Sequence, residues 1–593
     1  MKVKLNALFG IDLRSLAVLR IAFALLIIVD LINRATDLVA HYTDAGVLPR
    51  AGLMRLSSSR WFVSLHLMSG VWETEAFLFL VAGLFGLALL VGYKTRVSTI
   101  VSWFLLMSLH VRNPLIVQGG DIMLRVLLFW SIFLPLGARY SFDGVGKASS
   151  SQAPNRVLSA ATFAYLMQIV FVYGFTVLQK TGAAWRSDGS AIYYALSLDY
   201  LTTPVGEILR GFPNFLTLLT HAVFAFEVIG PFLLFSPIFT DAVRVVGIAL
   251  FLLLHLGFLS TLKIGLFPWV GAISMIAFLP SSIWDGIFGR FRATVTPTLT
   301  IYYDEDSAVC EKWLRIIATF FVSNAQIIPA QTNVPAKSPL QGNHSWTIID
   351  RWGHQYFGYQ AVQALAKASP LLSPLLYLLE RMRIDRPGER IYEFLAKRCR
   401  ATDRRGHLGS FDTRPEVKSS RAADVCIVIL LTYVFLWNIG TLATSRIKMP
   451  ERFKSVGYVL GLDQIWNMFA PYPPKDHGWY VIPGKLKSGA VVNLFGDGQQ
   501  VQWDKPTHVS TMYRNSRWRK YMEFLWASRR QKYLPYYAEY LCRKWNTDHR
   551  GTEILEELAV FVVIERTALP GEVSSIPERV MLLEGQCSKF END

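Results

Sequence analysis

Long apolar runs separated by short polar stretches fill the first half of the chain. A run of about 20 residues is long enough to cross the hydrocarbon core of a bilayer as an α-helix. Eight segments have or approach this length, at residues 13–38, 75–92, 97–111, 121–137, 158–179, 215–236, 242–261 and 264–281. The pattern therefore predicts a bundle of about eight transmembrane helices between residues 10 and 285.

The pattern of polar and apolar positions changes after Pro280. Residues 296–405 have a mixed composition with a strand-like start (TVTPTLTIYYD), which is typical of an α/β domain. A basic linker (406–423) leads into a ninth apolar span at 424–443, and residues 450–593 alternate like strands around a basic, aromatic helix. We therefore expect a polytopic α-helical membrane protein of about nine spans, with an α/β domain before the last span and a β-rich C-terminal soluble region.

Composition and charge support a membrane protein. Hydrophobic residues make up 52% of the chain, and Lys and Arg collect beside the apolar runs, at 139–156, 381–405 and 446–454. Basic residues in these places suit the anionic surface of a bilayer, so the net charge of +16 is not interpreted as a nucleic-acid footprint. The five cysteines show no CxxC or zinc-type spacing, which predicts neither a disulfide scaffold nor a metal site: Cys310, Cys399, Cys426, Cys542 and Cys587.

Basic residues near the span ends also predict the orientation. Residues 397–421 hold eight Lys or Arg before the ninth span, against four in 446–454 after it. Because cytoplasmic loops carry the excess of Lys and Arg, we expect the N-terminus and the 296–405 domain in the cytoplasm and the 450–593 region outside.

Ionisable residues gather at one rim of the predicted bundle. Asp121 and Arg125 lie four residues apart, so they share one helix face and can pair. His110, Arg112 and Asn113 lie at the same rim. Two interpretations stay open, a polar joint between helices and a polar pocket at the membrane face.

Three further ionisable groups interrupt or end apolar spans. Glu227 lies inside the sixth span and His255 inside the seventh, where burial is costly unless a partner is present. Lys180 ends the fifth span, five residues before Trp185. A lysine in this place can reach the headgroups as an anchor, or it can serve as a base in a dry pocket.

Several motifs resemble those of the horizontally transferred transmembrane domain (HTTM) family, which is related to the vitamin K-dependent gamma-carboxylases. They are YTDAGVLPR (42–50), HVRNPLIVQGGDIMLRVLLFW (110–130) and HLGFLSTLKIGLFPWVGAISMIAFLP (255–280), together with LDQIWNMFAPYPPKDHGWY in the region after the last span. The stretch FVYGFTVLQKTGAAWRSDGSAIYYAL resembles the carboxylase segment with the catalytic lysine, which implies that Lys180 is a base acting on a reduced quinone. Pro114 stands where the carboxylases have a histidine, so glutamate carboxylation is not implied.

A second resemblance covers the start of the inserted domain. LTIYYDEDSAVCEKW (299–313) is similar to the opening of the DCC family, thioredoxin-like thiol-disulfide oxidoreductases with a D-x-x-C-x-x-C pattern. Here Asp304 and Cys310 match, while Ser307 replaces the first cysteine and cannot form a disulfide. The resemblance implies a degenerate domain that serves as a docking module, or a lone Cys310 acting in redox sensing or ligand binding.

Two functional hypotheses follow. The first is a quinol-dependent membrane enzyme of the bacterial inner membrane, with Lys180 as base and a reduced quinone as cofactor. The alternative is a non-catalytic membrane module that assists maturation, export or assembly of a partner protein. The expected partners are the lipid bilayer, the quinone and a client protein, but no nucleic acid.

Overall fold

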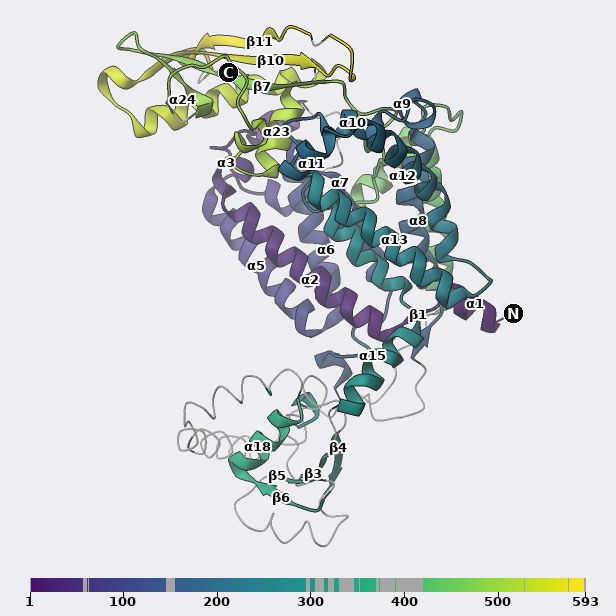
Figure 1. Cartoon of the computed structure of the whole chain (residues 1–593). Coiled ribbons are helices and arrows are strands. Elements are labelled where there is room, and N and C mark those ends of the chain that lie inside the picture. The colour runs from purple at the N-terminus through teal and green to yellow at the C-terminus, as the bar shows by residue number, and fades with distance from the viewer. Residues whose placement is uncertain are drawn as a thin grey trace.

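A computed structural model describes most of the chain. The described residues are 2–56, 61, 63–145, 155–294, 299–303, 314–317, 325–329, 346–350, 352–369, 373, 390 and 420–590, except for 497, 527 and 574. The helical bundle and the C-terminal region are described almost throughout, and the insert between them only in part (Figure 1).

Six helices of the bundle are long and apolar enough to cross a membrane. They are α2 (Leu13–Ala35), α5 (Trp72–Val91), α8 (Ala160–Gln179), α12 (Pro213–Leu234), α13 (Thr240–Thr261) and α21 (Arg421–Thr441). A seventh candidate is broken: α14 (Phe267–Ser274) and η4 (Met275–Phe278) meet α15 (Ser281–Thr294) at a bend of 93°. Each of these helices coincides with a predicted span, which confirms a multi-helix membrane protein.

The predicted spans at 97–111 and 121–137 form helices that are more buried within the protein than the six long apolar helices. The first is α6 (Thr95–Arg112) and the second is α7 (Gly119–Ser131), and the structure buries most residues of both. The helix predicted to reach residue 137 ends at Ser131, so α7 has 13 residues. At 1.5 Å per residue it is about 20 Å long, shorter than a hydrocarbon core of about 30 Å.

The two ends of the bundle are built differently. At the N-terminal end, Arg244 and Arg156 donate to backbone carbonyls of residues 7–10, and Arg14 pairs with Asp285. The opposite end carries short helices: α3 (Leu38–Tyr42), α4 (Arg50–Leu56), α9 (Ala183–Arg186), α10 (Ala191–Leu196) and α11 (Pro204–Arg210). Figure 1 shows α1 (Lys2–Phe9) and α9 to α11 at opposite ends.

The C-terminal region is an antiparallel sheet with helices packed against it. Its strands are β7 (Asp476–Val481), β8 (Pro483–Leu486), β9 (Val491–Asn493), β10 (Leu555–Arg566) and β11 (Glu578–Gln586), in the order β11–β10–β8–β9 with β7 also paired to β10. The α-helices described in this region are α22 (Glu451–Val459), α23 (Ser516–Trp526), α24 (Leu534–Asp548) and α25 (Cys587–Phe590). The β-rich C-terminal region is therefore confirmed.

A disulfide joins Cys542 of α24 to Cys587 of α25, two cysteines separated by 45 residues. The sequence prediction of no disulfide scaffold missed this bond because spacing along the chain identifies only short motifs such as CxxC. The two thiols meet because α24 packs against the sheet that leads into α25.

The insert contains a four-stranded sheet in the order β4–β3–β5–β6. The strands are β3 (Leu299–Tyr303), β4 (Ala325–Pro329), β5 (Trp346–Ile349) and β6 (Gln355–Phe357), followed by helix α18 (Gly358–Lys367). Strands β3 and β4 are parallel, and the other neighbours are antiparallel. Asp304, Ser307 and Cys310 lie outside the described residues, as does most of the 406–423 linker. The insert lies at the end of the bundle that carries the N-terminus, and the C-terminal sheet lies at the other end (Figure 1).

Candidate functional site

Lys180 lies at the point where α8 ends, and its side chain turns into the protein. Its backbone amide donates to the carbonyls of Thr176 (3.2 Å) and Val177 (3.1 Å), which completes the last helical turn. The residue is only 3% exposed. The interpretation of Lys180 as an anchor that reaches the headgroups is therefore wrong.

The partner of Lys180 is Glu227, from the middle of α12. The Lys180 Nζ donates a hydrogen bond to Glu227 Oε2, and Glu227 is 4% exposed. The same Nζ lies 3.9 Å from the centre of the Trp185 ring, a cation–π contact. Trp185 is held in place because its indole N–H donates to the carbonyl of Phe469 at 2.8 Å. The sequence singled out Lys180 and Glu227 separately, and the fold brings them together.

Tyr173 and His255 form a second polar contact along the same helix. The Tyr173 hydroxyl lies 2.7 Å from His255 Nε2, and both residues are buried. Tyr173 precedes Lys180 by seven residues, which places both on one face of α8 at its last two turns. His255 thus has a hydrogen-bond partner at one ring nitrogen, whereas its Nδ1 has none among the described residues.

Gly271 makes room for His255, which leads to a testable prediction. A Cβ at position 271 would lie 2.0 Å from His255 Cε1. Gly271→Ala is therefore expected to displace the imidazole from Tyr173 and to lower the free energy of unfolding in detergent by about 1–3 kcal/mol. The control is Gly257→Ala on α13, where no atom lies within 4 Å of the added methyl group. Equal stability of the two variants would contradict the packing of His255.

The rim residues form a separate group, a buried network of two carboxylates and two guanidinium groups. Asp121 accepts from Arg34 at 2.8 Å and from Arg517 at 2.8 and 2.9 Å. Asp30 accepts from Arg34 at 2.6 Å and from Arg517 at 2.6 Å. All four residues are at most 4% exposed, and their charges cancel.

The predicted pair of Asp121 and Arg125 is not formed. Arg125 turns to Asp463 instead, donating to its backbone carbonyl at 2.6 Å and to Oδ1 at 3.0 Å. Asp121 is occupied by Arg517, which lies 396 residues later in the sequence. The four-residue spacing allowed Asp121 to pair with Arg125. Asp121 instead binds the guanidinium of Arg517, which contacts Asp30 at the same time.

The remaining rim residues tie loops to the bundle. Arg112 donates to the carbonyl of Leu48 at 2.8 Å, and Asn113 donates to the carbonyl of His41 at 2.9 Å. Burial lowers the pKa of His41 to about 3, so its ring is neutral. His110 Nε2 lies 4.0 Å from Asp121 Oδ1, and neither ring nitrogen has a hydrogen-bond partner in the described part of the chain.

Lys180 and the rim network do not meet. Within the described residues, no hydrogen bond or ion pair connects Lys180 or Glu227 with Asn113 or Asp121. The sequence-predicted residues therefore form two groups, one around Lys180 and one around Asp121.

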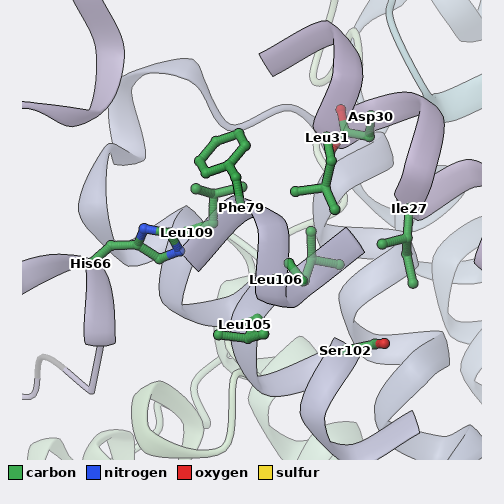
Figure 2. Close-up of a pocket in the computed structure, with 10 residues that line it drawn as sticks. Ile27, Asp30, Leu31, His66, Phe79, Ser102, Leu105, Leu106 and Leu109 are labelled. Carbon is green, nitrogen blue, oxygen red and sulfur yellow. The ribbon is translucent and has the colours of Figure 1, made fainter. Parts of the chain in front are cut away.

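A small cavity borders the rim network. It has a volume of about 10 Å³, room for a single water molecule, and lies between α2, α5 and α6. Figure 2 shows Asp30 and His66 on opposite sides of it, with leucine side chains between them. His66 Nδ1 lies 2.5 Å from Glu75 Oε2, and both residues are buried. Sequence reasoning missed this pair, although a carboxylate at the start of an apolar run was a signal for it.

One further cluster has the ligand types of a metal site. Single ligand atoms of Asp199, His477 and Glu565 lie within 4.8 Å of one another. Lys505 Nζ, however, lies 2.6 Å from Asp199 Oδ2 and 2.6 Å from Glu565 Oε2, so the chain itself supplies the cation. Burial lowers the pKa of His477, which keeps the imidazole neutral beside this ammonium group.

The comparisons with known proteins agree with the architecture of the bundle. The family model of the HTTM domain matches residues 10–284. No curated protein and no solved structure matches the chain. The matched region contains α2, α5, α8, α12 and α13, five helices long and apolar enough to cross a membrane. Residues 10–284 therefore match the HTTM domain, and the chain is an integral membrane protein.

Proposed function

We propose that this protein is a quinol-dependent membrane enzyme in which Lys180 and Glu227 accept and hold the proton of a reduced quinone. The observation that carries the proposal is the buried contact of Lys180 Nζ with Glu227 and the face of Trp185. A buried ion pair costs desolvation energy that apolar residues would avoid, so such a pair inside a membrane bundle is a functional-site hypothesis by default.

The chemistry needs Lys180 as a neutral amine. Transfer of one proton from Nζ to the Glu227 carboxylate leaves both groups uncharged, a state that suits an apolar site. The neutral amine then takes the proton of a quinol hydroxyl: the O–H bond breaks, an N–H bond forms, and the quinolate carries the negative charge. Dioxygen is the proposed acceptor: the quinolate loses two electrons and its second hydroxyl proton to become the quinone, and dioxygen takes up the two electrons and two protons, one of them returned from Lys180, to become hydrogen peroxide. Glutamate carboxylation is not part of the proposal.

The alternative is a non-catalytic module that assists maturation, export or assembly of a partner protein. The separation of Lys180 from Asp121 favours it, because the rim network closes with all charges paired. The insert would then be the docking platform. Its parallel β3–β4 pair followed by the antiparallel β5–β6 pair supports a thioredoxin-like sheet.

Oxygen uptake with added quinols distinguishes these functions. The full chain in nanodiscs is expected to oxidise a quinol, and Lys180→Ala is expected to lower the rate by at least about 100-fold, the scale of a lost general base. Lys263→Ala is the control, because the ammonium group of this exposed lysine donates to the Ser510 hydroxyl at 2.9 Å. Absence of turnover with a panel of quinols, or turnover indifferent to Lys180, would favour the module.

We further propose nine membrane crossings, with α6 and α7 shielded by the longer helices. The N-terminus and insert would face the cytoplasm of a bacterial cell and the C-terminal region the outside. The Cys542–Cys587 disulfide supports this placement, because disulfides persist in oxidising compartments. A reporter enzyme fused after residue 593, active only outside the inner membrane, tests it.

A further inference from the structure

A cavity of about 370 Å³ opens beside the C-terminal end of α21, and Lys180 is not one of its lining residues. Its lining comes from α7, α21, α22 and the segments before and after α22. The volume lies within the range of small-molecule sites, which hold ligands the size of a lipid headgroup with its glycerol.

Part of the cavity lining is apolar and aromatic. Trp437 and Tyr458 contribute rings, and Met449 and Ile465 contribute aliphatic surface. The Trp437 indole N–H donates to the carbonyl of Gln464 at 2.9 Å, which fixes the ring against the cavity. Trp and Tyr at the end of a membrane helix are typical of the level of the lipid headgroups.

Two lysines also belong to the lining. Lys448 Nζ donates to the carbonyls of Gly440 (3.2 Å) and Leu442 (2.8 Å), which uses two of its three N–H groups. Lys454 Nζ contacts the largely exposed Glu451 at 2.5 Å. The lining carboxylate of Asp463 is paired with Arg125 at 3.0 Å. The cavity therefore keeps a net positive charge.

The chain segment next to the cavity contains both basic residues and exposed apolar residues. Residues 446–454 contain four basic residues and one acidic residue. With the C-terminal region outside, as proposed above, the positive-inside rule does not account for this charge. Ile447, Phe453 and Val456 are 56%, 46% and 39% exposed. Basic residues interleaved with exposed apolar ones on a short helix are typical of a segment that lies in the headgroup layer.

We propose that this cavity binds a phospholipid with an anionic headgroup. The phosphate lies at Lys448 and Lys454, where one free N–H of Lys448 donates to it. The glycerol and the first acyl carbons lie against Trp437, Met449 and Ile465. This inference does not depend on the quinol chemistry at Lys180.

The test uses the full-length protein, delipidated in detergent, with lipids counted by native mass spectrometry. Dioleoylphosphatidylglycerol is the anionic probe and dioleoylphosphatidylcholine the zwitterionic one. Lys448→Ala/Lys454→Ala is expected to weaken phosphatidylglycerol binding by roughly tenfold. The control is Lys487→Ala/Lys544→Ala, which removes two exposed lysines of the C-terminal region.

Several outcomes would overturn the proposal. Equal affinity for the two lipids, or unchanged affinity in the Lys448/Lys454 variant, would show that these lysines do not select a headgroup. Displacement of the lipid by glycerol phosphate at equal concentration would show an anion site without a lipid site. If the double variant fails to fold, Met449→Glu takes its place and is expected to weaken phosphatidylglycerol binding through the apolar part of the lining.

Discussion

Lys180→Met is expected to lower the free energy of unfolding by about 3–5 kcal/mol, because it leaves the Glu227 carboxylate buried without its cation. Both residues are at most 4% exposed, so water cannot replace the lost partner. The measurement is the unfolding equilibrium of the purified protein in mixed micelles with increasing denaturing detergent.

A double variant separates this structural effect from catalysis. Lys180→Met/Glu227→Gln removes both charges and is expected to regain most of the lost stability, since a neutral amide costs less to bury than a carboxylate. Quinol oxidation should stay absent in the stable double variant if Lys180 is the base. A single variant as stable as the wild type would contradict the buried pair, and a double variant that still turns over would contradict the proposed base.

Arg517→Met is the second substitution with a large expected effect. It leaves Asp30 and Asp121 buried with Arg34 as the one cation that they share among the described residues, which gives the network a net negative charge. Breaking a buried ion network from one side typically costs about 3–5 kcal/mol. Because Arg517 is contributed by α23, the loss should also loosen the C-terminal region from the bundle, measured as faster amide hydrogen exchange in α23.

Arg514 provides the matched control on the same segment. It pairs with Asp37 at 2.9 Å, but its side chain is 67% exposed and the buried Asp37 keeps a hydrogen bond from Asn515 at 2.6 Å, so Arg514→Met should cost less than Arg517→Met. Asp30→Asn in the Arg517→Met background should recover part of the stability by restoring charge balance. Equal effects of the Arg514 and Arg517 substitutions would mean that the network is not shielded from water.

The C-terminal region contributes residues to both groups of buried charges, the one around Lys180 and the one around Asp121. Arg517 connects α23 to Asp30 and Asp121, and the carbonyl of Phe469 holds Trp185 beside Lys180. Both contacts come from the region after the last span. The candidate site is therefore complete only when that region is folded onto the bundle.

The sequence by itself determined where the membrane helices lie. Apolar runs such as 13–38 and 215–236 became α2 and α12 because transfer of about 20 apolar residues from water to lipid is a local quantity. The β-rich C-terminal region followed from alternation, also a local pattern. The apolar run at 121–137 predicted too long a helix. The helix that forms, α7, is surrounded by protein, and a helix in that environment need not match the bilayer thickness.

The partners of the charged residues were decided only by the tertiary structure. Asp121 has a neighbour four residues away, yet it binds Arg517 from 396 residues away, and Lys180 binds Glu227 from 47 residues away. Cys542 likewise meets Cys587 through the packing of α24. A charged residue inside an apolar run shows from the sequence alone that its burial costs free energy. Which distant group compensates that cost depends on how the helices pack.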